Sequence, residues 1–112
     1  MKLITAVIKP FKLDEVRLAV ADLGIQGVTV TEVHGYGASP GRVETYRGTD
    51  YSIDFLPKAK IELAVDDSIA EQVMEAVCNV ARTGSASDGK VWVLELEQAL
   101  RVRTGETGPD AI

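Results

Sequence analysis

The chain has 112 residues, enough for one domain with a single hydrophobic core. Its 46% hydrophobic and 26% charged residues are typical of a globular protein, and its net charge of −5 argues against a broad nucleic-acid surface, because binding to phosphates needs clustered Lys and Arg. The single cysteine excludes an internal disulfide framework, and the apolar run at residues 3–8 is too short for a signal peptide or a membrane span. We therefore expect a cytoplasmic protein without a membrane anchor of its own.

The first part of the chain predicts a strand, a helix and a second strand. Residues 3–8 are apolar and β-rich, and Pro10 ends this strand. Residues 12–24 carry apolar side chains at helical spacing, with acidic residues near the start and a glycine at the end. Residues 28–33 form the second predicted strand.

A long loop follows, and the pattern then repeats. Residues 35–51 are rich in glycine and tyrosine and nearly free of aliphatic side chains. Loops of this length in compact domains are usually functional or disordered. Residues 58–65 predict a strand, and the polar residues 66–68 offer N-caps to a helix that ends at Gly84. Residues 91–96 predict the fourth strand.

The order of these elements predicts one α+β domain over residues 1–112. A βαββαβ chain of this kind forms a ferredoxin-like fold, with four antiparallel strands and both helices on one face. The C-terminal tail, about 97–112, contains a possible fifth strand at residues 100–104. Alternation along the fourth strand places Trp92 and Leu94 on the face without helices. Such an apolar surface favours an oligomer, and cover by the tail is the alternative.

Residues with catalytic potential are few. His34 is the only histidine and lies beside a glycine at a strand end, which favours an exposed polar residue over a catalytic base. Cys78 has no activating cluster nearby in sequence, so we interpret it as a structural thiol. No His, Cys and Asp residues show the spacing of metal ligands. We expect neither a catalytic centre nor a protein-held metal site.

Phosphate binding has more support. The stretch GYG at 35–37 follows a strand and SDGK at 87–90 precedes one, and glycines let backbone amides approach phosphate oxygens. A strand at 100–104 would place Arg101 and Arg103 on the same side, so that the whole set would suit a polyphosphate. None of these stretches matches the Walker or Rossmann pattern, and each alone is more often a turn or a solvated charge.

The whole chain resembles the PII signal-transduction proteins. The stretches that carry the resemblance are IKPFKLDEV, GVTVTEV, GYG, YRGTDY, DFLPKAKIE, ARTG, DGKVWV and RVRTGE. The resemblance implies a ferredoxin-like homotrimer in which ATP and ADP compete for clefts between subunits, with Mg²⁺ possible beside ATP. It also implies a regulator of nitrogen metabolism, not an enzyme. The long loop, about 37–55, would be the T-loop, which docks onto a transporter such as an ammonium channel or onto a metabolic enzyme.

The resemblance also assigns roles to single residues. Thr29 and Glu62 would recognise the base. Lys58 stands where the family pairs a lysine with 2-oxoglutarate. Arg47 stands where an arginine enters an ammonium channel, and Tyr51 where some lineages uridylylate or adenylylate a tyrosine. The full set of positions at which the family holds nucleotide is Thr29, Gly37, Ala38, Ser39, Glu62, Ser87, Asp88, Gly89, Lys90, Arg101 and Arg103.

The chain departs from the family pattern after Gly37. The family usually reads Arg-Gln-Lys-Gly there, and this chain reads Ala38-Ser39-Pro40-Gly41. In the family the glutamine contacts both Mg²⁺ and 2-oxoglutarate, whereas Ser39 is too short to do the same and Pro40 has no N–H to donate. We therefore expect nucleotide binding to be kept and the response to 2-oxoglutarate, through Lys58 and Ser39, to be weakened.

Further departures concern other positions. Ala38 removes a phosphate contact, and Ser87 replaces a glycine close to the ligand. Thr49 and Asp50 replace the usual Ala-Glu before Tyr51, which leaves covalent modification open. A second interpretation is a ferredoxin-like trimer with a structural or enzyme-subunit role, in which the nucleotide cleft is not used.

Overall fold

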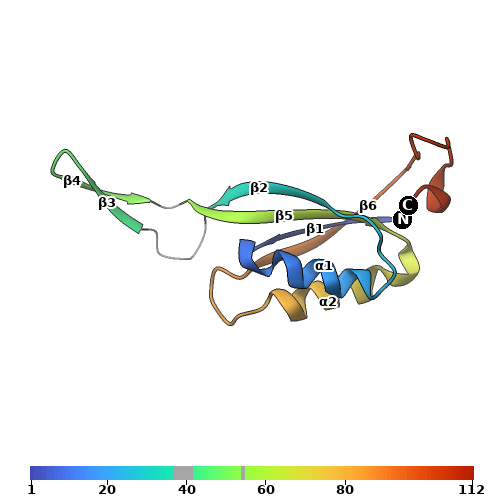
Figure 1. The fold of residues 1–112 in the computed structure, drawn as a ribbon, viewed down its shortest axis with the longest axis horizontal. Coiled ribbons are helices and arrows are strands. Elements are labelled where there is room, and N and C mark those ends of the chain that lie inside the picture. The colour runs from blue at the N-terminus through green and yellow to red at the C-terminus, as the bar shows by residue number, and fades with distance from the viewer. Residues whose placement is uncertain (37–41, 54) are drawn as a thin grey trace.

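The computed structural model describes residues 1–36, 42–53 and 55–112 (Figure 1). Its strands are β1 (Lys2–Ile8), β2 (Thr29–Gly35), β3 (Arg42–Tyr46), β4 (Thr49–Ile53), β5 (Leu56–Val65) and β6 (Gly89–Glu95). Its helices are α1 (Leu13–Ala21) and α2 (Ala70–Ala81), with 3₁₀ turns η1 (Pro10–Lys12), η2 (Asp67–Ile69) and η3 (Gly108–Ala111).

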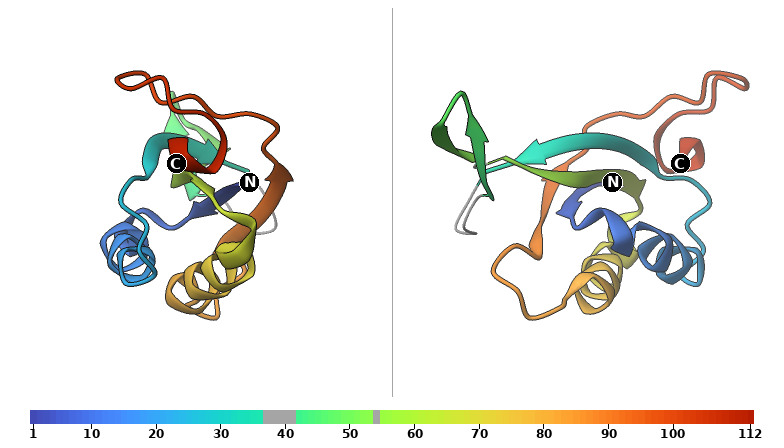
Figure 2. Two further views of the ribbon diagram at one scale, coloured as in Figure 1. Left: turned by 90° about the vertical axis from the view of Figure 1, so that its right-hand side faces the viewer. Right: turned by 60° about the vertical axis from the view of Figure 1, so that its left-hand side comes forward.

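Four strands form one antiparallel sheet in the order β2-β5-β1-β6. Both helices pack against the same face of this sheet, as two views of the ribbon show (Figures 1 and 2). This arrangement confirms the predicted α+β fold of the ferredoxin-like class. None of the helices in the part of the chain that the structure describes is long and apolar enough to cross a membrane.

The hydrophobic core lies between the sheet and the two helices. Alternate residues of β1 and β5 point into it, and helix residues four positions apart meet them there. Burying one such side chain contributes roughly 1.5–3 kcal/mol, so this layer holds the two halves of the chain together. The fully buried large side chains are Ile4, Ile8, Val16, Val20, Ile61, Val65, Val73 and Val77.

Asp66 caps the second helical segment, as the sequence predicted. Its carboxylate accepts a hydrogen bond from the amide of Ser68 at 3.0 Å and another from the Ser68 hydroxyl at 2.6 Å. These bonds satisfy donors at the start of η2, which leads directly into α2.

The segment between β2 and β5 carries a β-hairpin. Strands β3 and β4 pair with Tyr46 opposite Thr49, so Arg47 and Gly48 form a two-residue turn. Both turn residues have positive φ, 51° and 78°, as in the type I′ turn that matches the twist of a hairpin. Residues 42–53 of the predicted long loop thus form a hairpin, which projects from one end of the sheet (Figure 1). Residues 37–41 and 54 lie outside the described residues.

The tail turns back on itself instead of forming a fifth strand. Leu100 and Thr107 form an isolated antiparallel bridge, and the Gly105 amide donates to the carbonyl of Arg101 at 2.8 Å. The predicted strand at 100–104 is wrong, because these local backbone bonds reverse the chain within it.

The face of the sheet opposite the helices is open. Trp92 and Leu94 lie on it, opposite Thr5 and Leu3 of β1, and are 41% and 57% exposed. The tail leaves both side chains exposed, so the alternative in which the tail covers this face does not hold.

Candidate functional site

Asp88 organises the loop at 82–88, which joins α2 to β6. Its carboxylate accepts hydrogen bonds from the amides of Thr83 and Gly84 at 2.7 and 2.8 Å, and from the Thr83 hydroxyl. The Lys9 ammonium lies 3.8 Å from the same carboxylate. The Thr83 hydroxyl above all, then the two amides and Lys9, lower the pKa of Asp88 to about 2. Asp88 is thus a charged acceptor around which the loop closes.

The backbone of this loop satisfies most of its own donors. The Ser85 amide donates to the Thr83 hydroxyl at 3.3 Å, and the Ser87 amide to the Ser85 hydroxyl at 3.2 Å. The Asp88 amide donates to the Ser85 carbonyl at 3.2 Å. The loop amides that donate within the loop are those of Thr83, Gly84, Ser85, Ser87 and Asp88. In this conformation, an anion would meet mainly side-chain donors here.

Lys58 connects this loop to the base of the hairpin segment. Its ammonium donates to the carbonyl of Ser87, and its Cγ would lie 3.2 Å from a Cβ built on Gly35 at the end of β2. Burial lowers the pKa of Lys58, repulsion from Lys9 lowers it further, and Asp88 acts in the opposite direction. One side chain therefore contacts β2 and the loop before β6.

Gly89 has a packing reason to be glycine. Its φ is +111°, and a Cβ built on it would lie 1.8 Å from the carbonyl oxygen of Val7 in β1. Only a residue without a side chain lets β6 begin this close to β1, opposite Ile8. This close approach places Lys90, which is exposed, at the second position of β6.

Thr29 and Glu62 are brought together by strand register. They are directly opposed in the β2–β5 pair, so their Cβ atoms lie about 4.5–5.5 Å apart. Both belong to the open face, because their neighbours along β5 point into the core. Two positions further along this face, Lys60 and Lys90 flank Val7. The open face thus places lysines between the predicted base-binding pair and the loop at 82–88.

Arg101 and Arg103 lie at the other end of the sheet. Six residues, 91–96, separate Lys90 in β6 from the start of the tail, about 20 Å of extended chain. Arg101 donates to the Asp110 carbonyl at 3.2 Å and lies 3.8 Å from the Glu106 carboxylate. Arg103 is exposed in the turn, so the two arginines do not share one side of a strand as predicted.

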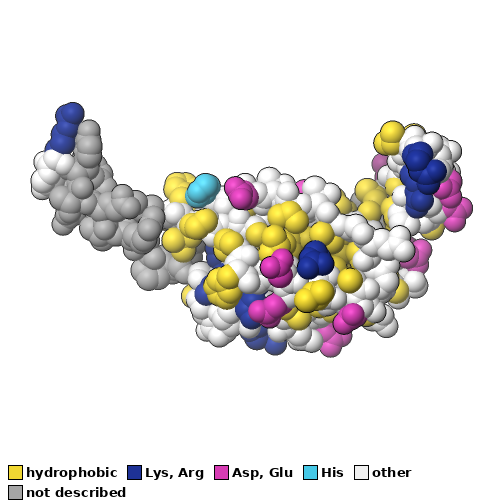
Figure 3. All heavy atoms as spheres, viewed as in Figure 1, with side chains coloured by type: hydrophobic (Ala, Val, Ile, Leu, Met, Phe, Trp, Pro, Cys, Tyr) yellow, Lys and Arg dark blue, Asp and Glu magenta, His cyan; other side chains and the backbone are white. Residues whose placement is uncertain are grey.

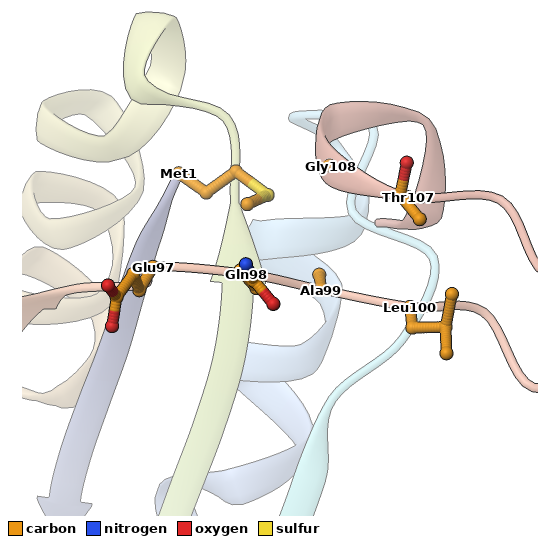
Figure 4. A pocket seen from close by; sticks show the side chains of 7 residues that line it. All are labelled: Met1, Glu97, Gln98, Ala99, Leu100, Thr107 and Gly108. Carbon is orange, nitrogen blue, oxygen red and sulfur yellow. The ribbon is translucent and has the colours of Figure 1, made fainter.

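The surface shows the same separation. On the face in Figure 3, Lys and Arg side chains gather mainly on the tail and on the half of the body nearer the hairpin. A hollow of about 210 Å³ beside the start of β6 is lined by Ile8, Cys78, Ala81, Arg82, Asp88, Gly89, Lys90 and Val91. A larger hollow of about 550 Å³ lies beside the tail (Figure 4) and is lined by Met1, Glu97, Gln98, Ala99, Leu100, Thr107 and Gly108.

Several predicted residues fall on the hairpin segment. Gly37, Ala38 and Ser39 lie outside the described residues, as does Pro40. Arg47 occupies the hairpin turn. Tyr51 lies on β4, opposite residue 44 of β3.

The sequence did not single out Lys9 and Thr83, although both contact Asp88. The Lys9 ammonium also donates to the Thr83 hydroxyl at 3.5 Å. Their only signal in the sequence is position: one residue follows a strand and the other follows a helix. His34 is exposed at the end of β2 and Cys78 is half-buried on α2. No group of three or more His, Cys, Asp or Glu among the described residues is placed to hold a metal ion.

Known proteins are similar to this chain over its full length. The family model for nitrogen regulatory protein P-II matches residues 1–106. The chain is 54% identical over 112 residues to the nitrogen regulatory protein P-II of Rhodospirillum rubrum and to that of Rhizobium meliloti, with all of both chains covered. It is 52% identical, again over the full length of both chains, to the nitrogen regulatory protein P-II of Haemophilus influenzae.

Proposed function

The chain belongs to the nitrogen regulatory protein P-II family, whose members are signal-transduction regulators and not enzymes, and from this premise we propose that it is a homotrimeric sensor of ATP and ADP. It acts in the cytoplasm and controls a target transporter or metabolic enzyme through the T-loop. Arg47, at the hairpin turn, contacts the target, and Tyr51 is the candidate for covalent modification.

One observation carries the proposal: the residues suited to phosphates lie at opposite ends of strand β6. Lys90 lies at the start of β6, and Arg101 and Arg103 follow its far end, about 20 Å away along the strand. A single polyphosphate cannot contact both groups in one chain. A complete site requires the tail of one copy beside the loop at 82–88 of another. Trp92 and Leu94 on the open face offer apolar surface for that assembly.

The chemistry of the open face favours an adenine base. The Glu62 carboxylate, beside Thr29, accepts a hydrogen bond from the exocyclic amino group of adenine. Guanine places a carbonyl oxygen at the corresponding position, which a carboxylate repels. Lys90 and the two arginines bind the phosphates, at about 1.5–3 kcal/mol for each charge-assisted bond. Mg²⁺ accompanies ATP through the phosphate oxygens.

We also propose a weak response to 2-oxoglutarate. Lys58 already donates to the Ser87 carbonyl, which leaves only part of its ammonium group for an incoming carboxylate. Compared with the family pattern, Ser39 also replaces a glutamine, and Pro40 lacks the backbone N–H that the usual residue would donate. Two lost bonds of about 1.5–3 kcal/mol each weaken binding roughly a hundredfold or more. Titration of the acid into the protein saturated with Mg·ATP tests this, with an S39Q/P40K variant expected to bind more tightly.

The two-chain site is tested with the variants K90A and R103A. Each alone is expected to lose affinity for ATP and ADP in isothermal titration. When the two are unfolded, mixed and refolded together, some sites combine Lys90 of one copy with Arg103 of another and regain binding. If the whole site lay within one chain, the mixture would not regain nucleotide binding. A stable monomer in light scattering, or no heat with either nucleotide and wild-type protein, contradicts the proposal.

A trimer with an unused cleft is the second candidate. The observation in its favour is the loop at 82–88, whose amides are largely satisfied within the loop. Thermal melting separates the two candidates, because a ligand that binds only the native protein raises its Tm. An unchanged Tm with saturating ATP and ADP would favour the unused cleft.

A further inference from the structure

Arg101 is held by the C-terminal segment that follows it. One terminal nitrogen, Nη2, donates to the backbone carbonyl of Asp110 at 3.2 Å. The other, Nη1, lies 3.8 Å from the carboxylate of Glu106. Glu106 is itself fixed, since its carboxylate accepts from the Thr104 hydroxyl at 2.7 Å and its carbonyl accepts from the Arg101 amide at 2.9 Å.

These contacts occupy the edge of the guanidinium group that recognises anions. Arginine binds a carboxylate or phosphate by directing two nitrogens at two oxygens. In Arg101, the oxygens beside Nη1 and Nη2 are the Glu106 carboxylate and the Asp110 carbonyl. A phosphate that binds Arg101 in this way takes the place of both.

The segment that holds Arg101 has little apolar packing of its own. The 3₁₀ turn η3 contains no buried residue, and Leu100 and Val102 are 67% and 100% exposed. The hollow of about 550 Å³ in Figure 4 borders the tail at Leu100 and Thr107. Two backbone contacts anchor this segment: the bridge between Leu100 and Thr107, and a hydrogen bond from the Gly108 amide to the Ala99 carbonyl at 3.0 Å. Segments with so few buried contacts open at low free-energy cost.

We propose that residues 106–112 compete with phosphate for Arg101, so that nucleotide binding and docking of the tail oppose each other. The inference rests on the proposed function for its ligand. When phosphate takes Arg101, η3 loses the side chain that ties it to the rest of the tail. By linkage, the docked tail lowers nucleotide affinity by the same factor by which nucleotide weakens docking. Because the Arg101–Glu106 pair is partly exposed, that factor is about two- to fivefold.

The first arm of the test measures affinity. E106Q removes the competing charge and is expected to bind ADP about two- to fivefold more tightly than wild type in isothermal titration at physiological salt. E97Q is the matched control, because Glu97 is an exposed glutamate of the same segment that lies outside the Arg101 contacts. Equal affinities of E106Q and E97Q, or weaker binding by E106Q, overturn the inference.

The second arm follows amide exchange of Gly108 in the tail. Without nucleotide, R101A is expected to exchange Gly108 faster than wild type, and R103A is not, because Arg103 takes no part in the contacts above. ADP added to wild type is expected to speed the same exchange, and stronger protection with ADP overturns the inference. No nucleotide binding by wild type overturns the proposed function, whereas equal exchange in ligand-free R101A and R103A overturns this inference alone.

Discussion

The ammonium group of Lys58, on β5, donates a hydrogen bond to the backbone carbonyl of Ser87, in the loop before β6. Lys58 is directly opposite Val33 in the strand pair that leads into the hairpin segment. A movement of the loop at 82–88 therefore reaches the base of the T-loop through one side chain. A nucleotide that bound as proposed and moved this loop would act on Lys58 through the Ser87 carbonyl.

The first prediction concerns the pKa of Lys58. Burial and repulsion from Lys9 lower it below the ordinary value of 10.5. K9M is expected to raise the pKa of Lys58, and D88N to lower it further. Between the lowered pKa and 10.5 the unfolded chain binds more protons, so this group adds stability as pH rises through that window. NMR titration of ¹³C-methylated lysines measures the pKa, and titration of Lys58 at 10.5 or above contradicts the prediction.

The second prediction concerns acid stability. Asp88 has its pKa lowered from 3.8 to about 2, so its contribution is fully present above 3.8 and is lost as pH falls toward 2. D88N is expected to be less stable than wild type at pH 7, with a difference that shrinks across this window. Urea unfolding at several pH values measures this difference in stability. Faster exchange of the Thr83 and Gly84 amides in D88N than in wild type would locate the difference in the loop at 82–88. A stability difference between D88N and wild type that stays constant down to pH 2 would mean that the charge of Asp88 is not its cause.

The third prediction compares two glycines with positive φ. G89A places a Cβ 1.8 Å from the Val7 carbonyl oxygen, so the strands must separate locally. We expect a loss of about 3 kcal/mol or more in the free energy of unfolding. G84A is the control, because Gly84 has a φ of +91° and open space around it, which leaves only backbone strain of about 1–2 kcal/mol. Equal losses in the two variants would show that the contact with β1 is relieved at no cost.

The fourth prediction compares two leucines that are each 57% exposed. Leu94 lies on the open face of the sheet and Leu18 on α1, on the helical side. L94D is expected to dissociate the proposed trimer while keeping its circular dichroism spectrum, because it places a charge in the apolar surface proposed as the interface. L18D is expected to remain assembled. Light scattering measures both, and an intact L94D trimer moves the interface elsewhere.

The main sheet and both helices could be predicted because their residues follow the two simple periods of strands and helices. Ile61, Leu63 and Val65 alternate toward the core, and Val73 and Val77 meet them at helical spacing. The order of the elements predicted an antiparallel sheet, whereas the register of β2 against β5 comes from the structure alone.

The hairpin and the tail depend on features that have no such period. The β3–β4 turn uses Arg47 with positive φ, where glycine or asparagine is the usual signal. In the tail, the alternation of Arg101, Val102 and Arg103 is typical of a strand, yet bonds between backbone groups near Leu100 and Thr107 reverse the chain. Local backbone bonding therefore overrides side-chain alternation in the tail.

The residues of the candidate site could be named from the sequence by residue type, whereas their contacts could not be predicted. Lys58, Asp88, Gly89 and Lys90 share one end of the sheet, as their places at strand ends suggested. The amides of the loop at 82–88 donate hydrogen bonds within the loop because of the conformation of the Thr83 hydroxyl and the Asp88 carboxylate. No spacing in the sequence encodes that conformation.

The distance between Lys90 and Arg103 has a genetic consequence. Where each site draws on two chains, a copy with R103A keeps its own Lys90 and damages only the site that it completes for its neighbour. K90A and R103A alleles expressed in the same cell would therefore complement each other in part, since some mixed assemblies would contain sites that combine Lys90 of one copy with Arg103 of another. A protein that held its whole site within one chain would show no complementation between these two alleles.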